Sequence, residues 1–186
     1  MFKHALRTIA AATLFCATSA HAAIFEFGAL LSGSQEVPAV ATPGNGSALV
    51  LFDSASKELV WNLSFRGLTS PVNTAGSGPT AHIHEAPAGS NGPVRIFIDS
   101  TNPGTLITGE GKVEGIFAGA AVIDAALEAA LFAGDLYFNL HTATFGSGEI
   151  RGQILPGAVT VVPLPGAVLL LGSALGGLTL VRRRAA

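Results

Sequence analysis

The chain has 186 residues, of which 49% are hydrophobic and 12% charged, and its formal net charge is −2. Five of its ten basic residues lie in the two terminal segments, so the central part carries five basic residues against twelve acidic ones, a net charge of −7. Such an acidic domain is a poor candidate for binding nucleic acid, which depends on basic side chains that neutralise phosphates. The only cysteine, Cys16, lies in the N-terminal segment, so the central part offers neither disulfide bonds nor thiolate metal sites.

Residues 1–22 are predicted to be a signal peptide. Lys3 and Arg7 give this segment a positively charged start, and an apolar stretch and a small-x-small motif that ends at Ala22 follow. We therefore expect cleavage between Ala22 and Ala23 and export of the remainder by the Sec machinery.

The central residues, 23–156, are predicted to form one all-β domain. Short segments rich in β-branched and aromatic residues alternate with Gly, Pro, Asn and Ser. The predicted strands are, in chain order, residues 24–31, 47–52, 58–68, 81–85, 94–99, 112–118, 135–142 and 149–155. Residues 122–131 have apolar spacing near 3.6 and precede Gly134, which predicts one short crossover helix. About eight strands and one helix indicate a β-sandwich or a β-barrel.

Three histidines lie in the central domain, on two of the predicted strands. His82 and His84 are two residues apart, so both imidazoles should lie on the face opposite Ile83. His141 belongs to the predicted strand 135–142, on the face away from the core. If these strands and the last one are neighbours, a single outer face carries His82, His84, His141, Asn139, Glu149 and Arg151.

Two interpretations of this polar face stay open. Three neutral imidazoles, or two with Glu149, could hold one zinc or copper ion, because both metals accept imidazole nitrogen. Alternatively, the histidines form a structural hydrogen-bond network with Asn139, Glu149 and Arg151. A guanidinium in the centre of the imidazoles would favour this second interpretation. We expect no catalytic residues, because the sequence shows neither a Ser-His-Asp pattern nor a phosphate-binding loop.

Four separated motifs, in this order and spacing, resemble the CHRD domain. They are Leu31-Ser32-Gly33-Ser34-Gln35-Glu36-Val37-Pro38, Ala81-His82-Ile83-His84 with Gly92-Pro93-Val94, Leu136-Tyr137-Phe138-Asn139-Leu140-His141-Thr142, and Gly148-Glu149-Ile150-Arg151-Gly152-Gln153. The resemblance implies an immunoglobulin-like Greek-key β-sandwich or barrel. It also implies a binding module, because the family is named after repeats of the animal protein chordin, which binds growth factors of the bone morphogenetic class.

The C-terminal segment, 163–186, has three parts after a spacer at 157–162. It comprises the turn of Val162, Pro163, Leu164 and Pro165, an apolar run over 167–181, and the basic cluster of Arg182, Arg183 and Arg184. The fifteen-residue run predicts a short transmembrane helix, below the roughly 20 residues of a relaxed span. The arginines should stay on the cytoplasmic side. This layout resembles the VPLP variant of the PEP-CTERM sorting signal of Gram-negative bacteria, which implies processing by an exosortase-type protease.

The sequence thus favours an exported, surface-sorted, non-enzymatic binding or extracellular-matrix module. The expected partners are the Sec machinery, the exosortase-type protease, the inner membrane transiently through the tail, and either an exopolysaccharide or an envelope protein. The alternative is a small zinc- or copper-binding domain that uses the paired histidines, with a redox or metal-sequestering function.

Overall fold

The computed structural model describes residues 23–74, 80–99 and 106–157. The predicted signal peptide, the sorting motif from Val162 to Pro165, the apolar run and the three terminal arginines lie outside the described residues, as does Ala22 of the predicted cleavage site. No helix within the described ranges is long and apolar enough to span a membrane.

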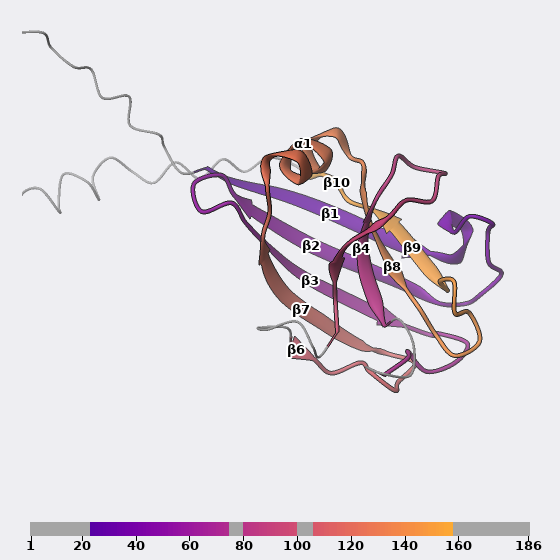
Figure 1. Ribbon diagram of the computed structural model, residues 1–186. Helices are drawn as coiled ribbons and strands as arrows, with labels where there is room; N and C mark the ends of the chain where they lie inside the picture. The colour runs from indigo at the N-terminus through magenta and orange to yellow at the C-terminus, as the bar shows by residue number, and fades with distance from the viewer. Residues whose placement is uncertain (1–22, 75–79, 100–105, 158–186) are drawn as a thin grey trace, which may run out of the picture.

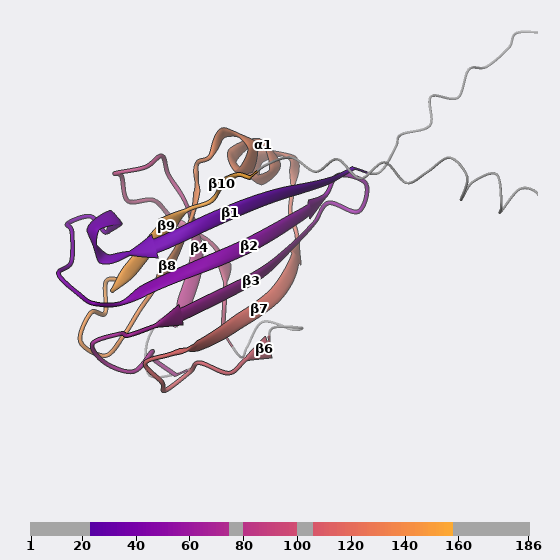
Figure 2. The same ribbon diagram turned by 180° about the vertical axis from the view of Figure 1, so that it is seen from behind.

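One antiparallel sheet curls into a barrel-like wall that is nearly closed (Figure 1). Its strands follow the order β5-β4-β8-β9-β1-β2-β3-β7-β6, and β10 pairs with β1. The strands are β1 (Ile24–Ser32), β2 (Asn45–Asp53), β3 (Glu58–Arg66), β4 (Ala81–Glu85), β5 (Val94–Phe97), β6 (Leu106–Ile107), β7 (Gly115–Val122), β8 (Leu136–Leu140), β9 (Ile150–Gln153) and β10 (Leu155–Pro156). The strands β1, β2, β3 and β7 form the long wall that faces the viewer in Figure 2.

The prediction of an all-β domain with one short helix is confirmed, and the continuous sheet corresponds to the barrel rather than to two stacked sheets. The predicted last strand is divided into β9 and β10. The two-residue strand β6 was not predicted, because two residues are too few to show a period of two. The strand predicted at 112–118 is β7 in the structure, and it begins and ends later than predicted. Its second half was missed because it is rich in Gly and Ala, which are not typical of strands.

Alternation along the strands builds the core. In β3, Leu59, Trp61 and Leu63 are buried and point into the barrel, while the intervening residues are exposed or partly exposed. The opposite wall contributes Ile83 of β4 and Phe138 of β8, which are both completely buried. The predicted inward positions of Trp61 and Ile83 are therefore confirmed.

We expect the substitution Ile83→Val to lower the free energy of unfolding by about 0.5–1.5 kcal/mol, because it removes one methylene from a packed core. Urea denaturation measures the change. Val122→Ala is the control, since Val122 is 75% exposed at the end of β7 and its loss leaves no cavity. Equal effects of the two substitutions would contradict the assigned faces.

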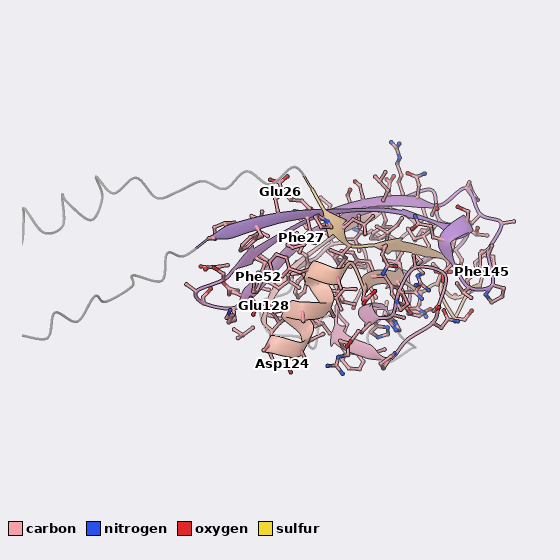
Figure 3. The ribbon with its side chains drawn as sticks, turned by 90° about the horizontal axis from the view of Figure 1, so that it is seen from above. Glu26, Phe27, Phe52, Asp124, Glu128 and Phe145 are labelled. Atoms are coloured by element: carbon pink, nitrogen blue, oxygen red, sulfur yellow. The ribbon has the colours of Figure 1, made fainter. Side chains whose placement is uncertain are left out.

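The helix α1 (Ala125–Ala133) lies at one end of the barrel (Figure 3). Asp124 caps its start, because its side chain accepts a hydrogen bond from the N–H of Leu127 at 2.8 Å. Gly134 ends the helix in the left-handed conformation, with φ +76°. The helix begins three residues later than predicted because Val122 still belongs to β7. Phe145, in the loop after β8, lies at the other end of the barrel (Figure 3).

Candidate metal centre

The three strands that carry the predicted polar face are neighbours in the sheet. The central strand β8 lies between β4 and β9. His82 is opposite Asn139, His84 is opposite Tyr137, and Asn139 is opposite Arg151. His141 follows β8 directly, and its N–H donates to the carbonyl oxygen of Thr80 at 2.9 Å. The three strands are therefore adjacent, as a shared polar face requires.

This face is buried, which corrects the prediction of an exposed outer face. His82 and His141 are each only 5% exposed, and Arg151 is 1% exposed. Loops fold back over the strands from both sides: the Asn91 amide donates to the carbonyl oxygen of Val37 at 2.8 Å, which joins two of these loops. The period of two in the sequence assigns a side of the sheet, but it does not show which loops will cover that side.

The three imidazoles lie together under these loops. His82 Nδ1 and His141 Nε2 are 3.1 Å apart, within hydrogen-bond distance. The ring centres of His82 and His84 are 5.5 Å apart, and those of His84 and His141 are 6.4 Å apart. One nitrogen of each ring lies within 4.8 Å of the chosen nitrogens of the other two. These three residues therefore form a group that could hold one metal ion, which we call the histidine cluster.

Backbone carbonyls orient two of the three rings. His84 Nδ1 lies 2.9 Å from the carbonyl oxygen of Gly92, and His141 Nδ1 lies 3.0 Å from that of Gly146. A carbonyl oxygen can only accept a hydrogen bond, so the proton of each neutral ring is on Nδ1 and the lone pair is on Nε2. Metal-binding histidines are commonly held by a hydrogen bond of this kind.

The remaining nitrogens differ in their partners. His141 Nε2 accepts a hydrogen bond from the Nδ1–H of His82. His84 Nε2 is buried and has no hydrogen-bond partner among the described residues. A buried nitrogen with an unused lone pair is costly, and most buried polar atoms have a partner. The cluster thus presents one buried lone pair, on His84 Nε2, that no described residue uses.

Burial keeps the cluster neutral at physiological pH. Removal from water lowers the pKa of His82 and of His141 to about 4, and the close approach of the rings contributes to both shifts. Burial likewise lowers the pKa of His84. Neutral imidazole is the form that binds metal, so protons compete only weakly with a cation at pH 7.

Among the described residues, the Arg151 guanidinium makes no hydrogen bond with an imidazole of the histidine cluster. Its guanidinium carbon lies 3.4 Å from the centre of the Tyr137 ring, and its Nη1 donates to Asn91 Oδ1 at 3.3 Å. The Tyr137 ring, stacked on His84, lies between this charge and the imidazole, although the positive charge of Arg151 still contributes to lowering the pKa of His84. The arrangement that would favour a purely structural network is therefore not seen.

Glu149 lies apart from the histidine cluster, contrary to the prediction that it could share a ligand set with two histidines. Its carboxylate accepts hydrogen bonds from the Thr42 hydroxyl at 2.5 Å, the Thr69 N–H at 2.6 Å and the Thr142 hydroxyl at 2.7 Å. The residue is completely buried. It joins three segments of the chain and is a structural carboxylate.

Glu36 is a buried carboxyl group that the sequence did not single out as part of the site. Burial raises its pKa to about 7, and the nearby charge of Arg151 opposes this shift. Asn139 Oδ1 and Glu36 Oε1 are both buried and without a partner in the described part of the chain. Both atoms lie within 2.6 Å of where a Cβ on Gly148 would be, so the two oxygens are close together.

We expect Glu36→Gln to change how stability depends on pH. The folded-state pKa is raised, so the stability that the carboxyl contributes is present below about pH 4.5 and is lost as the pH rises through about 7. At pH 8 the variant, which stays neutral, should be more stable than the wild type by up to about 3 kcal/mol. The difference should shrink toward pH 4.5, as followed by urea midpoints, and a constant difference over this range would contradict the burial of a proton on Glu36.

The family model of the CHRD domain matches residues 27–154, which is more than half of the chain. The chain belongs to the CHRD domain family. No curated protein and no solved structure matches the chain significantly. The CHRD match contains all three residues of the histidine cluster, together with the loops that cover it. A CHRD domain is typical of an extracellular or binding module, in line with the sequence-based expectation.

Proposed function

We propose that this CHRD domain binds one divalent transition-metal ion through His82, His84 and His141. The observation that carries the proposal is the buried, unpartnered Nε2 of His84 beside the pair formed by His82 and His141. Three neutral imidazole rings converge there, and two of them are already oriented by backbone carbonyls.

The donor set favours zinc or copper(II). Both ions accept neutral imidazole, and no thiolate is present in the central domain to favour a softer ion. Two nitrogens that each lie 2.0–2.1 Å from one ion can be at most about 4.2 Å apart. The ligand nitrogens of the cluster lie within 4.8 Å of one another. To complete the site, the rings would rotate slightly and the hydrogen bond between His82 and His141 would open, so that His141 Nε2 and the unprotonated nitrogen of His82 face the ion. Three protein ligands would leave a fourth position for water or another ligand.

Metal content tests this function directly. We expect the chain, purified without a histidine tag, to bind one Zn²⁺ or Cu²⁺ per molecule in isothermal titration calorimetry at pH 7. Elemental analysis of the protein as purified from cells should find about one zinc or copper ion per molecule, whichever of the two the cell supplies. The absence of heat with both ions, together with a metal-free preparation, would contradict the proposed site.

The proposed location is the bacterial envelope. The layout of residues 1–22 and 163–186 supports export, a short C-terminal transmembrane helix and sorting by an exosortase-type protease, with the product at the cell surface or outside the cell. In a host that has the protease, mass spectrometry should find a mature chain that begins at Ala23 and lacks Arg182 to Arg184. An exported chain that retains these arginines would contradict the sorting function.

A second candidate function, attachment to a matrix polysaccharide or an envelope protein, has one observation in its favour. The outer surface of the wall formed by β1, β2 and β3 exposes aliphatic side chains, among them Leu30 at 75%, Leu49 at 47% and Val60 at 41%. Clustered exposed apolar residues often mark interaction sites. Leu30→Ser with Leu49→Ser should release the protein from the cell surface if this wall is the contact, while unchanged retention would contradict it.

A further inference from the structure

We infer that Tyr137 is a positioning residue of the histidine cluster: it holds His84 in the orientation that presents Nε2 to a metal ion. The inference rests on the proposed metal-binding function. Tyr137 is almost completely buried on β8, directly opposite His84 on β4. The two rings are stacked, with centres 5.0 Å apart and planes 9° from parallel.

The Tyr137 hydroxyl acts on His84 through Gly92. The N–H of Gly92 donates to the hydroxyl oxygen at 3.1 Å, and the carbonyl oxygen of the same residue accepts the Nδ1–H of His84 at 2.9 Å. Tyr137, Gly92 and His84 therefore form a closed circuit of three contacts. The circuit fixes both the plane of the imidazole and the nitrogen that carries its proton.

The loop can lie this close to the strand because residue 92 is glycine. A Cβ at Gly92 would overlap the carbonyl oxygen of Glu85, so any larger residue would push the loop away from β4. The neighbouring residue Asn91 also fixes this loop, because it accepts a hydrogen bond from Arg151 and donates one to the carbonyl oxygen of Val37. The carbonyl that orients His84 is thus part of a rigid segment.

Arg151 supports Tyr137 from the side away from His84. Its guanidinium carbon is 3.4 Å from the ring centre, a distance typical of a close cation–π contact. The Tyr137 ring is held between the imidazole and the guanidinium. It can therefore rotate little, and neither can the imidazole stacked on it.

The substitutions Tyr137→Phe and Tyr137→Leu separate the two contributions. Phenylalanine keeps the stacked ring but loses the hydroxyl, and leucine loses both. Because changes in the residues around metal ligands typically cost 10–100-fold in affinity, we expect Zn²⁺ affinity to fall about 10-fold for Tyr137→Phe and about 100-fold for Tyr137→Leu. Phe138→Leu, on the same strand but facing the core, is the control: it should lower stability and leave Zn²⁺ affinity within about twofold.

A second measurement does not depend on metal. Nitrogen-15 NMR of the metal-free full chain should show His84 as a single tautomer protonated at Nδ1 in the wild type, and as a mixture of tautomers in Tyr137→Phe. Unchanged affinity and an unchanged single tautomer in both Tyr137 variants would overturn the inference. If the wild type binds no Zn²⁺ but Tyr137→Phe produces mixed tautomers, the proposed function fails and the positioning role of Tyr137 stands.

Discussion

The substitution His141→Asn should lower the affinity of the chain for Zn²⁺ by more than about 100-fold. It removes one of three donors, and even changes beyond the ligands typically cost 10–100-fold. His141 is central to the cluster because its Nε2 already lies 3.1 Å from His82 Nδ1, and its Nδ1 is anchored to the carbonyl of Gly146. Calorimetric titration at pH 7 measures the loss.

The substitution Glu114→Asn is the control, because Glu114 is exposed and lies outside the histidine cluster. The Glu114→Asn chain should keep the wild-type affinity. A similar loss at both positions would indicate adventitious binding to side chains in general and would count against the cluster. Circular dichroism of His141→Asn should remain that of the wild type, because the substitution keeps a polar side chain of smaller volume.

The substitution Glu149→Ala should lower the free energy of unfolding by about 3–5 kcal/mol. The carboxylate accepts three hydrogen bonds, from Thr42, Thr69 and Thr142, and no solvent reaches it. Its removal leaves these donors without their acceptor, at a cost of about 1–3 kcal/mol each where water cannot enter. Urea denaturation followed by tryptophan fluorescence measures the change, since Trp61 is buried in the core.

Glu58→Ala is the control for this substitution, because Glu58 is exposed at the start of β3. Its loss should change stability by less than about 0.5 kcal/mol, as is usual for surface positions. Zn²⁺ affinity of Glu149→Ala, measured well below the denaturation midpoint, should stay near that of the wild type, because Glu149 is outside the histidine cluster. A large loss of Zn²⁺ affinity without a loss of stability would indicate that Glu149 is a metal ligand after all.

The period of two in the sequence was enough to predict which residues share a side of the sheet. It placed His82 and His84 opposite Ile83, and the structure has Ile83 in the core and both imidazoles on the other side. The same reasoning put His141 with them, and the order β4-β8-β9 brings the three rings together. Local periodicity and neighbouring strands therefore account for the cluster.

The contacts made by loops could not be predicted in the same way. Glu149 alternates with Ile150 as expected, but its carboxylate is taken by threonines from two distant loops and from the end of β8. The tautomers of His84 and His141 depend on the carbonyls of Gly92 and Gly146, which no side-chain pattern reveals. Such long-range backbone contacts depend on the folded path of each loop.

X-ray absorption spectroscopy of the Zn²⁺-loaded chain tests the central claim most directly. We predict one zinc per chain with three imidazole nitrogens at 2.0–2.1 Å and one further light-atom ligand, and we predict that this signal is lost in the variant with His82, His84 and His141 all replaced by Asn. A first shell with fewer than three imidazoles, or the same spectrum from the triple variant, would contradict metal binding by the histidine cluster.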